Sequence, residues 1–176
     1  MDFLNQQIDV GSLPDIEKVN WKKIEKDYLK VLRIQWLLVS LFLFAVAAII
    51  VFLTPISRSS TLVIAICSLA VLLSAFYLLM IERSFHHRAY AIRGNDILYR
   101  HGWLIRSIDA CPFNRIQHCT VNAGPFERKF GLSSLTLYTA ASGEADTKIS
   151  GIPEATAISV REFILKKITP YEGPAN

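Results

Sequence analysis

The chain has 176 residues, of which 52% are hydrophobic and 19% charged, and its formal net charge is +4. So mild a positive charge, without an aromatic and basic stacking platform, gives no support to nucleic-acid binding. It suits contact with an anionic inner leaflet, and it equally suits simple solubility.

Residues 1–33 are expected to form an amphipathic juxtamembrane segment. Ser12 and Asp15 have the spacing of a capping box. The helix that follows could lie on the membrane surface, with its cations against anionic lipid and its tryptophans at the interface. Alternatively, it could pack its apolar face on the soluble domain, and the two arrangements are compatible. One face carries Ile16, Trp21, Ile24, Tyr28, Val31 and Leu32, and the opposite face carries Lys22, Lys26 and Arg33; Trp36 is the second interfacial tryptophan.

Two uncharged apolar runs, residues 36–53 and 61–81, follow. Each is close to the roughly 20 residues that an α-helix needs to cross hydrocarbon, and neither shows the polar stripe of a soluble core helix. The connection over residues 54–60 is too short for a domain, and Pro55 is expected to end the first helix. Residues 34–81 are therefore predicted to be a transmembrane helical hairpin. A cleaved signal peptide is not expected, because a long charged segment precedes the first run.

The positive-inside rule places both termini in the cytoplasm, so the chain is predicted to be a multi-pass protein of the inner (plasma) membrane. The loop between the runs carries only Arg58. The cations on the two outer sides are Lys18, Lys22, Lys23, Lys26, Lys30 and Arg33 before the first run, and Arg83, Arg88, Arg93 and Arg100 after the second.

After Ile81 the apolar pattern changes to alternation, which indicates short, half-buried antiparallel strands. Between the fourth and fifth strands, Pro125 and Gly131 bracket one short helical turn whose Phe126 and Phe130 are aligned at i and i+4. The strands are predicted at residues 85–92, 97–100, 104–111, 115–121, 134–140 and 146–150, with a hairpin turn at residues 93–96.

A final amphipathic helix begins at Pro153 and Glu154. Residues 82–170 are thus predicted to be one α+β domain, a bent antiparallel sheet of about seven strands capped by a C-terminal helix, and residues 171–176 a tail. The buried face of the helix would carry Ala157, Val160, Phe163, Ile164 and Ile168, opposite Glu162 and Lys166.

An ordered set of motifs in this region resembles the bacterial membrane-flanked PH-like (pleckstrin-homology-like) domain family, YdbS type. The resemblance implies two transmembrane helices joined to a seven-stranded bent sheet with a C-terminal helix, and it covers most of residues 82–168. The chain departs from the pattern at His118 and Cys119, and at Ala141. The motifs are Arg115-Ile116-Gln117, Gly124-Pro125, Arg128, Gly131-Leu132, Leu135, Leu137, Thr139-Ala140 and Gly151-Ile152-Pro153.

Regular alternation would put Arg115 and Gln117 on one face of a strand, together with Cys119. They could form a polar binding patch that includes Arg128. Alternatively, they could bond the backbone of the loop from Gly124 to Gly131 and hold it in place. The second interpretation is favoured, because Gly124, Pro125 and Gly131 already have backbone roles.

Membrane lipid is an expected partner. The cations between Arg88 and Arg106 stand at alternating positions, which argues against a specific phosphoinositide clamp and favours general attraction to anionic lipid. Trp103 is either an exposed anchor or an aromatic at the edge of the core. The candidate membrane-surface residues are Trp21, Lys22, Lys26, Arg33, Trp36, Arg83, Arg88 and Trp103.

No motif for catalysis is found, since no Gly-x-Ser-x-Gly elbow, phosphate loop or Rossmann glycines are present. The spacing of His and Cys does not predict a metal site, and Cys111 and Cys119 are interpreted as small apolar strand residues. The expected function is a non-catalytic binding or scaffolding module, without cofactor, that associates with a membrane-protein partner or with itself. An alternative is a structural subunit of a homo- or hetero-oligomeric membrane assembly, for which Ala70 and Ser74 would allow close helix packing. Less favoured alternatives are an anionic-lipid-binding module and an enzyme with an unrecognised site.

Overall fold

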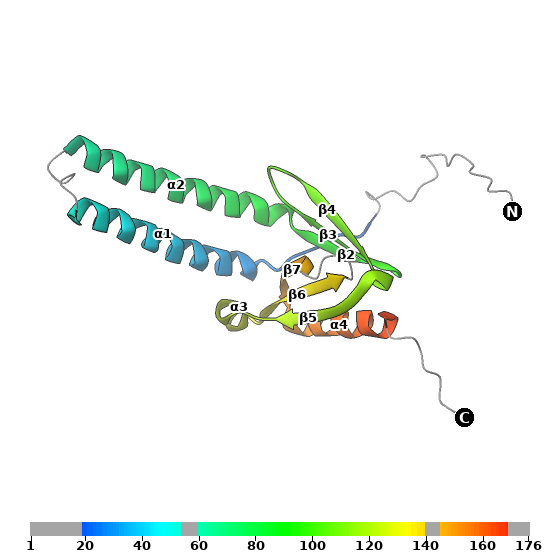
Figure 1. Cartoon of the computed structure of the whole chain (residues 1–176). Coiled ribbons are helices and arrows are strands. Elements are labelled where there is room, and N and C mark those ends of the chain that lie inside the picture. Colours follow the sequence, from blue (N-terminus) through cyan, green and yellow to red (C-terminus); the bar gives the residue numbers. More distant parts are fainter. Residues whose placement is uncertain (1–18, 54–59, 140–144, 169–176) are drawn as a thin grey trace, which may run out of the picture.

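The computed structural model describes residues 19–53, 60–139 and 145–168. It shows two long helices side by side that join, at one end, a domain of two sheets and two further helices (Figure 1). Several predicted features lie outside the described residues: the capping box at Ser12 and Asp15, the helix stop at Pro55, the departure at Ala141 and the tail over residues 171–176.

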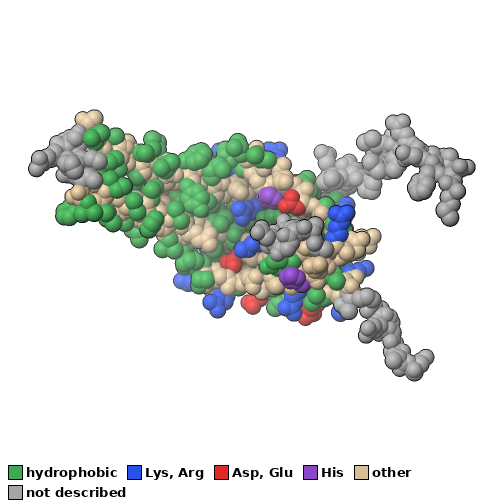
Figure 2. All heavy atoms as spheres, viewed as in Figure 1, with side chains coloured by type: hydrophobic (Ala, Val, Ile, Leu, Met, Phe, Trp, Pro, Cys, Tyr) green, Lys and Arg blue, Asp and Glu red, His purple; other side chains and the backbone are tan. Residues whose placement is uncertain are grey.

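The two apolar runs form α1 (Asp27–Leu53) and α2 (Ser60–His87), an antiparallel hairpin. Their most apolar 18-residue windows have mean hydropathies of 2.9 and 2.7, and only 6% and 11% of those windows are buried. Both helices are long and apolar enough to cross a membrane. Figure 2 shows hydrophobic side chains covering the hairpin and charged side chains gathered over the domain.

Small and polar side chains hold the two helices together. Ser40 and Ser74 share a hydrogen bond of 2.8 Å, and the indole Nε1 of Trp36 donates to the carbonyl of Ser74 at 2.9 Å. At the domain end of the hairpin, the Arg33 guanidinium bonds Glu82 Oε1 at 2.7 Å. Ala70 and Ser74 are buried, so the small residues that could serve helix packing are used inside this hairpin.

In its described residues the domain has seven antiparallel strands in two sheets, which confirms the predicted fold class. The first sheet has the order β1 (Lys22–Lys23), β2 (Ala89–Ile92), β3 (Asp96–His101), β4 (Ser107–Pro112). The second has the order β5 (Ile116–Asn122), β6 (Leu132–Thr139), β7 (Ala145–Pro153). A 3₁₀ turn (Phe113–Arg115) joins the sheets, α3 (Pro125–Lys129) lies between β5 and β6, and α4 (Glu154–Ile168) closes the domain.

The N-terminal segment differs from its prediction. Residues 19–33 do not form a separate amphipathic helix: Lys22 and Lys23 are a short edge strand paired with Tyr90 and Ala89, and α1 begins only at Asp27. Strand pairing with a partner far along the chain overrides the local helical pattern. The apolar positions Ile24, Tyr28 and Val31 are nevertheless buried, so the alternative in which this segment packs on the domain is confirmed for them.

Two strand predictions began too early. Residues 85–87 belong to α2, which continues as a helix past its apolar run, and β2 begins at Ala89. Residues 104–106 are a loop, and β4 begins at Ser107. The alternation of apolar residues predicts a strand in each stretch. So short an apolar run does not distinguish the two-residue period of a strand from the 3.6-residue period of a helix.

The hairpin and the domain share one hydrophobic core. Ile24, Tyr28 and Val31, from the start of α1 and the segment before it, belong to the same buried cluster as Phe85 near the end of α2. The cluster continues into both sheets and α4 through Tyr90, Ile97, Leu135, Leu137, Ile149, Ile152 and Ile164. The long helices are therefore built into the domain and not merely tethered to it.

Gly151 in β7 allows a close approach of the Tyr28 ring in this junction. Its φ is +80°, and a Cβ added there would lie 2.6 Å from Cγ of Tyr28. The Gly151 carbonyl also accepts a hydrogen bond of 3.0 Å from the Glu25 N–H. Only glycine allows both this backbone conformation and the approach of the tyrosine ring.

We expect Gly151→Ala to lower the free energy of unfolding by about 2 kcal/mol or more, because the methyl group meets the Tyr28 ring in a left-handed backbone conformation. Denaturant unfolding of the full chain in lipid nanodiscs, followed by near-ultraviolet circular dichroism, measures the change. Gly94→Ala is the matched control, since nothing lies within 4 Å of a Cβ at that position.

A double-mutant cycle with Tyr28→Ala isolates the contact. In the Tyr28→Ala background, Gly151→Ala should cost clearly less than in the natural chain, because the ring it meets is gone. Equal costs in the two backgrounds would contradict a direct contact between these residues.

Candidate functional site

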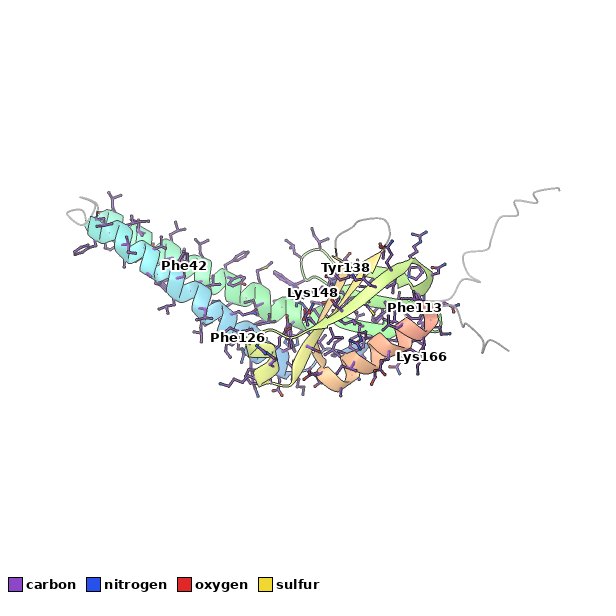
Figure 3. All side chains as sticks on the ribbon, turned by 60° about the horizontal axis from the view of Figure 1, so that its bottom comes forward. Phe42, Phe113, Phe126, Tyr138, Lys148 and Lys166 are labelled. Atoms are coloured by element: carbon purple, nitrogen blue, oxygen red, sulfur yellow. The ribbon has the colours of Figure 1, made fainter. Side chains whose placement is uncertain are left out.

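Two polar hollows open where the hairpin meets the domain, with volumes of about 430 and 390 Å³. We call them together the junction crevice. Lys148 and Ser150 of β7 line both hollows, and Figure 3 labels Lys148 and Phe126 near the base of the hairpin. The first hollow is lined also by Ser84, Arg88, Tyr99, His101, Gly102, Asp109 and Thr147, and the second by Tyr28, Val31, Gln35, Asn122, Gly124, Pro125, Phe126, Glu127 and Ser134.

The first hollow contains a guanidinium with unused hydrogen-bonding capacity. Arg88 Nη2 lies 3.5 Å from Ser84 Oγ, and its buried Nε has no hydrogen-bond partner among the described residues. Opposite it, His101 Nε2 and Asp109 Oδ2 are 2.9 Å apart. Burial raises the pKa of the Tyr99 phenol, and the positive charge of Arg88 partly offsets that rise. The chemistry of this hollow suits a polar or anionic group more than an apolar one.

The second hollow is organised by Glu127, a residue that the sequence analysis did not select. Its carboxylate accepts hydrogen bonds from the Gly124 N–H at 2.9 Å and from the Ser134 hydroxyl at 2.8 Å. Ser134 Oγ also lies 2.9 Å from Ser150 Oγ, so Glu127, Ser134 and Ser150 form one chain of polar contacts. The signal in the sequence was the spacing of Gly124 and Glu127, which is half of a capping box.

The glycines and the proline of the motif have the expected backbone roles. Pro125 occupies the first helical position of α3, after Gly124 as N-cap. Gly131 has a φ of +65° just beyond α3, and its N–H donates to the Arg128 carbonyl at 3.1 Å. The Gly131 carbonyl in turn accepts from the N–H of Glu154, at the start of α4. Phe126 and Phe130 pack against the core, as predicted.

Arg115 and Gln117 do not act as either interpretation expected. A register shift between Ile116 and His118 breaks the alternation, so Ile116 and Cys119 are buried while Gln117 is exposed. The seven residues of β5 separate Arg115 from α3 by about 23 Å at about 3.3 Å per residue. These side chains therefore form no common patch with Arg128, which is exposed on α3, and they cannot hold the loop that Glu127 holds.

Four of the candidate membrane-surface residues lie around the ends of the long helices. Arg33 is paired with Glu82, and Trp36 is bonded to α2 through Ser74. Trp103 lies in the loop between β3 and β4, and the centre of its ring is 5.9 Å from the guanidinium carbon of Arg83. Arg33 and Trp36 are thus part of the hairpin's own contacts, whereas Trp103 is placed beside α2 by Arg83.

The other four lie on or within the domain. Arg88 lines the junction crevice. Trp21 stacks under Arg100, whose guanidinium carbon lies 4.7 Å from the ring centre, and Lys22 and Lys26 are exposed. The nine helical steps from Asp27 to Trp36 span about 14 Å. Lys26, which precedes Asp27, thus lies at least about 14 Å from Trp36 along the axis of α1.

The cysteines of the domain have the places that the sequence predicted. Cys111 in β4 and Cys119 in β5 are both buried and belong to the core cluster. Burial raises the pKa of the Cys119 thiol, with a smaller opposing effect of Arg161. Among the described residues, no group of three or more His, Cys, Asp or Glu side chains is arranged to hold a metal ion.

A family model described as "Bacterial PH domain" matches residues 29–168. No curated protein and no solved structure matched the chain. The matched range includes nearly all of α1, all of α2 and every strand of the domain except β1.

We expect Glu127→Ala to lower the free energy of unfolding by about 1–3 kcal/mol, because the Ser134 hydroxyl and the Gly124 N–H both lose their acceptor in a partly buried site. Unfolding by denaturant in nanodiscs measures the loss. Glu162→Ala, on the exposed side of α4, is the control and should change stability little. Equal effects of the two substitutions would contradict the assigned role of Glu127.

Proposed function

The chain belongs to the family of bacterial PH domains, and we propose that it is a membrane-anchored, non-catalytic binding or scaffolding module at the cytoplasmic face of the bacterial inner membrane. In this proposal α1 and α2 span the bilayer and the PH-like domain stands directly beneath them. The ligand of the module is a protein or a polar group that enters the junction crevice.

The observation that carries the proposal is the shared core of hairpin and domain. Because Tyr28, Val31 and Phe85 are buried with the strands of the domain, the domain has a fixed orientation relative to the two helices. A domain on a flexible linker would present all of its faces equally, whereas this one holds the crevice at the base of the hairpin. A fixed orientation favours a partner that is itself at the membrane.

The polar side chains of the crevice hold one another in place, as a pre-organised binding site requires. His101 is paired with Asp109, and the Ser134 hydroxyl bonds Glu127 and lies 2.9 Å from Ser150 Oγ. Arg88 and the exposed Lys148 retain donors for a ligand, so recognition of an acidic group is the chemistry that the crevice offers.

The orientation of the protein can be tested with reporters fused after Asn176. The lysine and arginine distribution predicts that the C-terminus is cytoplasmic, so a reporter that fluoresces only in the cytoplasm should be active and an enzyme reporter that requires the extracytoplasmic space should be silent. Fusions within the hairpin loop, after Ser59, should give the opposite pattern. A silent cytoplasmic reporter and an active external one at Asn176 would overturn the proposed location.

The binding role can be tested by photo-crosslinking in native membranes. A photoreactive residue replaces Lys148 in the crevice of the tagged full-length chain, and Lys166, on the exposed side of α4 and labelled in Figure 3, is the matched control. A heterologous protein adduct from position 148 and none from position 166 is the expected result. Adducts between copies of this chain alone, at both positions, would favour a homo-oligomeric structural subunit and contradict a binding module.

A further inference from the structure

The loop between β3 and β4, residues 102–106, exposes two consecutive large apolar side chains. Leu104 is 76% exposed and Ile105 81%, as much as Phe52 and Leu53 at the far end of the hairpin. In the described part of the PH-like domain, no other large hydrophobic side chain exceeds the 44% exposure of Ile108. The domain otherwise covers its large apolar residues, so this pair requires a specific explanation.

The shape of the loop is fixed by Gly102. Its φ is +84°, and a Cβ at that position would lie 1.9 Å from the carbonyl oxygen of Ile105. The backbone thus closes on itself within four residues, which only glycine permits. Leu104 and Ile105 are presented at the tip of a defined turn.

The loop lies at the level where α2 leaves its apolar run. Trp103 contacts Arg83, and Arg83 is two residues beyond Ile81, or about 3 Å along the helix axis. A bilayer has an interfacial layer about 5–8 Å thick on each side of its hydrocarbon. Figure 1 shows the loop between β3 and β4 beside the last turns of α2, on the side of the domain toward the hairpin.

The chemistry of the loop matches a lipid interface. Trp103 is an amphipathic aromatic, Leu104 and Ile105 are apolar, and the flanking cations Arg83 and Arg106 are exposed. Residues 102–106 contain no acidic side chain. An interfacial anchor has this arrangement: tryptophan lies at the headgroup level, aliphatic side chains lie just below it, and arginines lie near anionic headgroups.

We propose that Trp103, Leu104 and Ile105 insert into the interfacial layer of the leaflet from which α2 emerges, as a third point of contact between the protein and the bilayer. This inference rests on the proposed membrane-spanning role of the hairpin. It adds that the domain itself is docked on the lipid surface through the β3–β4 loop.

The test uses single-tryptophan versions of the full chain in nanodiscs of phosphatidylethanolamine and phosphatidylglycerol with brominated acyl chains. Trp21→Phe with Trp36→Phe leaves Trp103 as the reporter. Its emission should be blue-shifted, lose most of its intensity to the brominated lipid and respond weakly to aqueous acrylamide. Adding Leu104→Asp and Ile105→Asp should remove most of the lipid quenching and shift the emission to the red, whereas Ile158→Asp on α4 should change neither.

A second reporter separates this inference from the proposed function. Trp21→Phe with Trp103→Phe leaves Trp36, which reports on the hairpin. Lipid quenching of Trp36 without quenching of Trp103 overturns the loop insertion alone, and absence of quenching at both overturns membrane spanning as well. If Trp103 is shielded from both lipid and acrylamide, protein covers the loop. If lipid quenching is unchanged after the two aspartate substitutions, Leu104 and Ile105 do not keep the loop in the membrane. Either result overturns the proposal.

Discussion

The packing of Tyr28 against Gly151 is the contact on which the rest of the structure depends. It joins the first turn of α1 to β7, at the one position of that strand where the backbone has a positive φ. With this contact in place, Val31 and Phe85 lie in the same core as the strands. The two long helices and the domain then behave as one body, and their relative orientation is set by packing and not by a linker.

The junction crevice is a consequence of this arrangement. The corner between the hairpin and the domain is lined by polar side chains in both hollows, which share Lys148 and Ser150 of β7. Glu127 and the two serines satisfy one side by hydrogen bonding among themselves. The other side keeps an arginine whose buried Nε has no partner in the described structure. The two halves of the crevice therefore differ: one is structurally satisfied, and the other has capacity to bind.

The sequence predicted the parts of this protein that local pattern determines. The apolar runs gave α1 and α2, alternation gave most of the strands, and Pro125 and Gly131 gave α3, because each of these signals acts within a few residues. Prediction from the sequence failed where contacts between residues far apart in the chain determine the local structure. Lys22 and Lys23 carry no strand signal and become a strand only by pairing with β2. The register shift between Ile116 and His118 breaks the alternation, so Gln117 is exposed while Cys119 is buried. Among the crevice residues, Glu127 of α3 was missed because its role depends on a contact with Ser134 of β6.

The edge strand β1 has a further implication for biosynthesis. The sheet that begins with Lys22 and Lys23 is completed by strands made after the whole hairpin, so the domain is interrupted in sequence by the two helices. If the hairpin spans a bilayer, β1 can meet β2 only when both helices have inserted and brought their outer ends to the same side. In a chain with only one helix inserted, Ile24 and Tyr28 would lie on the opposite side of the membrane from the rest of the domain's core. Folding of the domain would thus act as a check on insertion, and a wrongly threaded chain would expose its unfinished core to quality-control proteases.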